Sequence, residues 1–136
     1  MIEFNYEIDF ELKNEGQLKS WLEKCIKVRG FKLGEINYIF CDDDDLLKLN
    51  VEFLKHDTLT DIISFDYSLG KLINGDIYIS VERVMENAVE FSQRVENEIN
   101  RVMIHGLLHY MGFKDKSEKE QEEMREQEDI CLSLLG

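Results

Sequence analysis

The sequence predicts an α+β fold in which four strands precede a helical second half. Short segments within the first 80 residues alternate apolar and polar side chains or are rich in Ile, Tyr and Phe, whereas later residues repeat apolar side chains at helical spacing. No proline, low-complexity segment or internal repeat interrupts either half. Strands early and helices late are typical of helices layered on one sheet.

Four segments are the candidate strands. Apolar residues alternate from Ile2 to Ile8, and residues 35–41 form a second segment rich in side chains that favour strands. Residues 61–67 and 71–80 are two further candidates joined through Gly70. This last pair is expected to form a hairpin-like extension of the sheet.

About five helices complete the prediction. The first carries Leu18, Leu22 and Ile26 at helical spacing and ends before Gly30. Four aspartates at residues 42–45 lead into a short, leucine-rich helix; such aspartates can bind Mg²⁺, but they also cap a helix and complement its positive end. The last three helices are expected at residues 81–91, 95–111 and 118–135.

The size and composition of the chain predict one domain, residues 1–136. With 136 residues, 43% of them hydrophobic, the chain has material for a single core. The first residues mix charged and apolar side chains without the apolar run of a signal peptide or membrane span, so we expect a cytoplasmic protein that does not enter the membrane. Three widely spaced cysteines predict buried free thiols.

The charge distribution is uneven. A net charge of −13 argues against wholesale attraction to nucleic acid. Residues 13–32 nevertheless hold six basic residues against two acidic ones, while residues 115–129 hold eight acidic residues against three basic ones. The basic stretch is either a solvated helix face or a contact with RNA or the ribosome.

The helix predicted at residues 95–111 carries the chemistry. His105 and His109 are four residues apart, so they lie on one helix face and can reach one cation. Gly112 can end the helix, and Asp115 follows three residues later. The segment H-G-L-L-H-Y-M-G-F-K-D has the ligand spacing of metzincins with Asp in place of the last His.

These three residues, His105, His109 and Asp115, predict a catalytic metal site. Three protein ligands leave one position open, and a zinc ion lowers the pKa of its bound water to about 7. Such a site favours hydrolysis. The alternative is a pair of hydrogen-bonded core histidines with Gly112 as a plain helix stop.

The motif lacks the general base of zinc peptidases. In those enzymes a Glu follows the first His, whereas Gly106 occupies that position here, which disfavours peptidase activity. Arg101 and Glu98 lie on the face of His105, one and two turns earlier. Arg101 could contact a phosphate and Glu98 a ligand histidine, or the two could form a surface ion pair.

The sequence resembles the YbeY family of bacterial metal-dependent endoribonucleases. Three blocks carry the resemblance, in order over residues 46–135: LNVEFLKHDTLTDIISFDY, GDIYIS and HGLLHYMGF. It implies a small mixed sheet of four strands packed by helices, a metal usually assigned as zinc, one per chain, and activity in the maturation of small-subunit ribosomal RNA. His105 and His109 match the first two ligands of the family motif.

Two positions depart from the family pattern. Asp115 and Lys114 stand where the family has His and Asp, so zinc ligation is expected with more tolerance for other divalent cations. Leu54 stands where the family has an Arg in the block L-N-x-x-[FY]-R. Lys55 and His56 could replace that cation as phosphate contact or proton donor, although a lone His in a polar loop is often simply exposed.

Three further residues match the family block. Asn50 matches its Asn, and Thr60 and Asp61 match its Thr-Asp pair, which starts the strand beneath the cleft. A strand cap and turn hydrogen bonds are the alternative roles.

Three functions remain open from the sequence. The first is a single-strand-specific metal-dependent endoribonuclease, in which a metal-activated water attacks an RNA phosphodiester and Lys55, His56 or Arg101 stabilises charge. The second is a non-catalytic ribosome-assembly factor with a structural metal, favoured by Leu54, and the third is a small metallopeptidase. The expected partners are ribosomal RNA and the small ribosomal subunit, and the expected state is a monomer.

Overall fold

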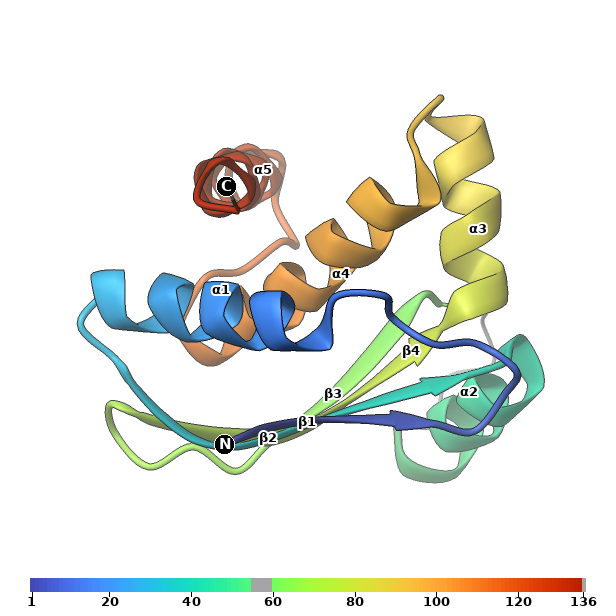
Figure 1. The fold of residues 1–136 in the computed structure, drawn as a ribbon, viewed down its shortest axis with the longest axis horizontal. Coiled ribbons are helices and arrows are strands. Elements are labelled where there is room, and N and C mark those ends of the chain that lie inside the picture. The colour runs from blue at the N-terminus through green and yellow to red at the C-terminus, as the bar shows by residue number, and fades with distance from the viewer. Residues whose placement is uncertain (55–59, 136) are drawn as a thin grey trace.

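The computed structural model describes residues 1–54 and 60–135, and it shows an α+β fold (Figure 1). One sheet of four strands and five α-helices form within these residues, as the sequence predicts. The strands are β1 (Ile2–Tyr6), β2 (Lys32–Cys41), β3 (Ile62–Asp66) and β4 (Leu72–Ser80). The helices are α1 (Glu15–Val28), α2 (Asp43–Leu49), α3 (Val81–Glu90), α4 (Val95–Tyr110) and α5 (Glu118–Ser133).

The sheet is mixed, with the strand order β1-β2-β4-β3. β1 and β4 both pair with β2 in parallel, while β3 pairs with β4 in antiparallel register, so the expected hairpin-like pair is confirmed. Gly70, at φ +59°, lies in the connection between β3 and β4. Antiparallel neighbours allow this short connection, whereas the parallel pairs need crossovers, which α1 and the segment around α2 supply.

Helices cover the sheet unequally (Figure 1). α1 and α4 lie over one face, where Ile36, Tyr38 and Phe40 of β2 alternate into the main core. A smaller cluster of Cys41, Leu46 and Ile63 lies under α2 on the other face. α5 packs outside α1 and α4, where Trp21 donates a hydrogen bond from Nε1 to the Cys131 carbonyl oxygen at 2.7 Å.

The four aspartates cap α2. The Asp42 side chain accepts a hydrogen bond from the Asp45 backbone N–H at 2.8 Å, and Asp43 pairs with Arg83 of α3. These contacts support the capping interpretation. A five-residue π-helical segment, Asn50–Leu54, follows α2, and the sequence pattern did not predict it.

The cysteines follow the prediction, whereas two strand boundaries differ from it. Cys25, Cys41 and Cys131 are buried and free, as expected. The first strand ends at Tyr6 instead of residue 8, and the second starts at Lys32 instead of residue 35. Among the described helices, none combines the length and apolar character needed to cross a bilayer.

Candidate metal centre

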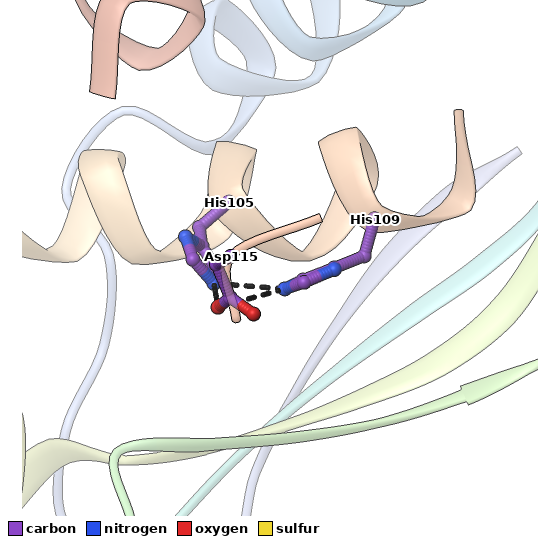
Figure 2. A group of neighbouring side chains, drawn as sticks. All are labelled: His105, His109 and Asp115. Carbon is purple, nitrogen blue, oxygen red and sulfur yellow. Dashed lines mark hydrogen bonds and ion pairs between the residues drawn. The ribbon is translucent and has the colours of Figure 1, made fainter. Parts of the chain in front are cut away.

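The end of α4 and the following loop bring the predicted ligands together (Figure 2). α4 ends in a Schellman motif, in which the Phe113 N–H bonds the Leu108 carbonyl oxygen and the Gly112 N–H bonds the His109 carbonyl oxygen. Gly112 has φ +97°, which only glycine adopts at low cost. The chain therefore turns back at once and places Asp115 opposite the two histidines.

A capping box fixes the other end of this loop. The Ser117 hydroxyl accepts from the Glu120 N–H at 3.1 Å, and the Glu120 carboxylate accepts from the Ser117 N–H at 2.9 Å. The segment that carries Asp115 is thus anchored to α4 on one side and to α5 on the other.

The three donor atoms form a tight triangle. His105 Nε2 and His109 Nε2 are 3.0 Å apart, and Asp115 Oδ2 is 3.2 Å from each. Two rings tilted by 77° point toward one carboxylate oxygen, as Figure 2 shows. Each side chain is 22–38% exposed, so the site is open to solvent on one side.

This donor set fits a zinc ion. Zinc binds His nitrogen and carboxylate oxygen at about 2.0–2.2 Å in tetrahedral geometry, which spaces neighbouring donors about 3.3 Å apart. The observed separations of 3.0–3.2 Å match that spacing. His105, His109 and Asp115 are therefore a candidate metal group with room for a further ligand on the open side.

A buried carboxylate of α5 orients the first histidine. Glu128, 6% exposed, lies with Oε2 at 2.6 Å from His105 Nδ1. Its other oxygen accepts from Arg101 Nη1 at 2.8 Å, and Arg101 Nη2 donates to Asp129 at 2.7 Å. With a proton on Nδ1, His105 presents the lone pair of Nε2 to the metal site.

Burial and charge act in opposite directions on His105. Burial lowers its pKa, but the hydrogen bond and negative charge of Glu128 outweigh that effect, so the pKa is raised. Burial raises the pKa of Asp61 and also that of Glu98, although Arg101 partly offsets the shift at Glu98. Three perturbed groups thus gather near the candidate metal group.

The other residues predicted for the site differ in whether the structure brings them to the candidate metal group. Glu128, and not Glu98, contacts the ligand histidine, and Arg101 pairs with Glu128 and Asp129. The phosphate contact predicted for Arg101 stays a prediction. Lys55 and His56 lie outside the described residues, as does the side chain of Leu54. Asp61 directly precedes β3 at Ile62.

Sequence reasoning missed Glu128. The sequence held a signal, because Glu128 stands at helical spacing between Met124 and Cys131, and the structure shows all three to be buried. A carboxylate on the apolar stripe of a helix requires a buried partner.

A groove connects the ligand cluster to α3 and α5. It measures about 820 Å³, and its lining includes His105, Asp115, Asp61, Asn87 and Phe91. Gly106 faces the opposite way, since a Cβ there would lie 3.0 Å from Ile77 and 3.1 Å from Ile62. A general base at that position would point into the core, which agrees with the argument against a peptidase.

The fold and the triangle of donor atoms define a class of α+β protein whose candidate metal group is carried by one helix and the loop after it. The family model for endoribonuclease YbeY matches residues 3–136. The chain belongs to the YbeY endoribonuclease family.

Individual relatives agree over nearly the full length. The chain is 58% identical to endoribonuclease YbeY of Flavobacterium psychrophilum, covering 99% of this chain and 96% of that protein. Its identity to endoribonuclease YbeY of Flavobacterium johnsoniae is 57%, covering 99% and 97%. The solution structure of TM1509 from Thermotoga maritima superposes with a TM-score of 0.69 at 29% identity, covering 99% of this chain and 89% of that one.

Proposed function

We propose that this protein is a metal-dependent endoribonuclease that cuts single-stranded RNA and acts in the maturation of small-subunit ribosomal RNA. The triangle of His105, His109 and Asp115, with donor atoms 3.0–3.2 Å apart, carries the proposal. Family membership supports the reaction class. The proposed partners are ribosomal RNA and the small ribosomal subunit, in the cytoplasm.

Zinc is the proposed metal. Two imidazole nitrogens and one carboxylate oxygen suit it, and the carboxylate of Asp115 also accommodates other divalent cations. When bound, the ion supplies a Lewis acid for a phosphoryl oxygen and lowers the pKa of a water molecule to about 7.

The protein's own groups prepare the site in three ways. Glu128 holds the Nδ1 proton of His105 and so keeps Nε2 directed at the ligand cluster. The Gly112–Ser117 loop holds Asp115 opposite both histidines. Lys114 and Lys116 flank Asp115 and are exposed, so they add two cations beside the position where an RNA phosphate would lie.

The decisive experiment is cleavage of a precursor small-subunit ribosomal RNA fragment by the purified protein. We expect cutting with added zinc, none after chelation, and none by a His109→Ala variant. Val89→Ala, at an exposed position on α3, is the matched control and should cut like the wild type. Zinc content is measured in every sample.

One alternative keeps a specific observation in its favour. Leu54 stands where the resemblance places an Arg, and a protein without that cation could act as an assembly factor whose metal only stabilises the fold. Well-folded, zinc-loaded protein that binds the ribosomal subunit and cuts no RNA would favour this alternative. In that case the wild type cuts no RNA, and the effect of His109→Ala would be a lower free energy of unfolding.

A further inference from the structure

The groove beside the metal ligands has a second wall that the proposed reaction does not use. Phe91 stands at the end of α3, Glu98 lies in α4, and both line the same 820 Å³ groove as His105 and Asp115. A groove of this size can hold a group as large as a nucleotide.

Glu98 is a largely buried residue whose carboxylate accepts no hydrogen bond from the described residues. It is 8% exposed, and none of the described residues donates a hydrogen bond to its side chain. Arg101, one turn away, is engaged by Glu128 and Asp129 instead. The oxygen atoms of Glu98 are not among the fully buried, unpaired polar atoms of the described residues, so they open onto the groove and can accept N–H donors from a ligand there.

Phe91 offers an aromatic face at the rim. The residue is 58% exposed, and the backbone turns immediately after it, at Ser92 with φ +53°. Unpaired bases in single-stranded RNA are bound by stacking on exposed aromatic rings. Phe91 and Glu98 line the same groove and offer two kinds of contact that a nucleobase makes, one with its ring face and one with its edge.

The acidic residues that line the groove favour a neutral base over a phosphate at the wall formed by Phe91 and Glu98. The groove lining also holds Asp61, Glu118 and Glu122, and Arg125 and His105 are the basic residues among the described residues that line it. These carboxylates repel phosphates, whereas the N–H edge of a neutral base is attracted to them.

We propose that Phe91 and Glu98 form a nucleobase subsite, in which one unpaired base of the RNA stacks on Phe91 and donates N–H groups to Glu98. The inference rests on the proposed function and names a part of its substrate. Guanine fits this subsite best, because its N1–H and N2–H groups are adjacent and both can donate to one carboxylate. Adenine, cytosine and uracil each place an acceptor beside their donor on that edge.

Binding of short labelled RNA tests the subsite. Fluorescence anisotropy measures the affinity of zinc-loaded protein for single-stranded oligonucleotides that differ at one central base: guanine, inosine, which lacks the 2-amino group, or adenine. A gel checks that each oligonucleotide is intact after the titration. The variants are Phe91→Ala, Phe91→Tyr and Glu98→Gln, with Val89→Ala, a change at an exposed residue of α3, as the control.

The subsite predicts a distinct result for each variant. Phe91→Ala weakens binding of every oligonucleotide by about tenfold or more, and Phe91→Tyr restores it, because stacking tolerates any aromatic ring. Glu98→Gln removes the preference for guanine over inosine while retaining binding. Equal affinity of Phe91→Ala and Val89→Ala, or an unchanged guanine preference in Glu98→Gln, would overturn the subsite.

Two other outcomes separate the inference from the proposed function. If the wild type cuts precursor RNA but the Phe91 and Glu98 variants bind and cut like Val89→Ala, only the subsite fails. If the wild type neither binds nor cuts RNA, the proposed function fails and the subsite with it. A lower number of bound metal ions per chain in Glu98→Gln would show that Glu98 holds a second cation and would also overturn the subsite.

Discussion

His105 has two ring nitrogens, and the structure gives each a different partner. Nδ1 lies 2.6 Å from Glu128, while Nε2 faces His109 and Asp115. Carboxylates that bind the far nitrogen of a ligand histidine fix its tautomer and ring orientation. We therefore expect metal affinity at this candidate site to depend on Glu128 of α5, which is not one of the three candidate ligands.

Replacing Glu128 should weaken metal binding. We expect Glu128→Ala to reduce zinc affinity about 10- to 100-fold, measured by competition with a chromophoric chelator, because the orientation of His105 is lost. Nitrogen NMR of His105 in the metal-free protein should change from the Nδ1–H tautomer to a mixture. Glu126→Ala, an exposed change on the same helix, is the control. Unchanged affinity in Glu128→Ala would contradict this role.

The raised pKa of Asp61 predicts that the stability of the fold depends on pH. Burial raises its pKa more than the nearby His105 lowers it, so the folded protein holds this proton more tightly than the unfolded chain does. Stability should therefore fall as the pH rises from about 4, the unfolded pKa, through the raised folded value. Asp61→Asn has no carboxyl to titrate at this position. The free energy of unfolding of this variant, relative to that of the wild type, should therefore increase across that pH interval and then stay constant.

Urea unfolding of metal-free protein at several pH values measures this effect. If the free energies of unfolding of wild type and Asp61→Asn differ by the same amount at every pH, the Asp61 carboxyl has the same pKa in the folded and unfolded states, and the prediction is wrong.

At the scale of elements, the position of α4 over the sheet depends on a close contact at β4. Tyr110 donates a hydrogen bond to the Phe65 carbonyl oxygen at 2.9 Å. A Cβ on Gly75 would lie 2.3 Å from the Tyr110 hydroxyl oxygen and 2.6 Å from that same carbonyl oxygen. Glycine at this position lets the end of α4, one residue after His109, approach the sheet.

Two glycine substitutions should therefore differ in cost. Gly75→Ala should lower the free energy of unfolding by about 1–3 kcal/mol or more, because backbone and a hydrogen-bonded ring must move. Gly106→Ala should cost less, since its Cβ would meet only methyl ends of Ile77 and Ile62 and alanine favours the helix by about 1 kcal/mol. Urea denaturation gives both values, and the reverse order would refute this account of the packing.

At the scale of the whole molecule, the candidate metal group lies where α4, the loop after it and α5 meet. α4 and the loop supply the three candidate ligands, α5 supplies Glu128, and α5 also accepts the Trp21 hydrogen bond from α1. A ligand that binds only the folded state stabilises everything that it holds in place. Metal binding should therefore stabilise α5 as well as the segments that carry the candidate ligands.

Removal of the metal should lower the stability of the whole fold. Zinc at 100 times its dissociation constant contributes about 2.7 kcal/mol, so chelation should reduce Tm by several degrees. Hydrogen exchange should then increase most in the Gly112–Ser117 loop and along α5, and in the sheet by no more than the loss of global stability. Equal melting of chelated and zinc-loaded protein, with zinc binding verified, would contradict this coupling.

The comparison of sequence with structure shows which features are local. Strand alternation, helical periodicity, the spacing of His105 and His109, and Gly112 as the helix end were all predictable, because each depends on residues within a few positions of one another. Strand ends were less predictable: β2 begins at Lys32 because its partner in β4 begins at Leu72. The π-helical segment after α2 had no local signal.

The sequence by itself determined the α+β class, the candidate ligand triad and the family resemblance, since these follow from order and spacing along the chain. Only the tertiary structure decided which carboxylate meets His105, which groups line the groove, and that Arg101 is held by α5. Glu98 is closer than Glu128 to His105 in sequence, yet Glu128 makes the contact. The physical reason is packing: α5 lies against α4, and its buried face carries a residue 23 positions away to the ring nitrogen.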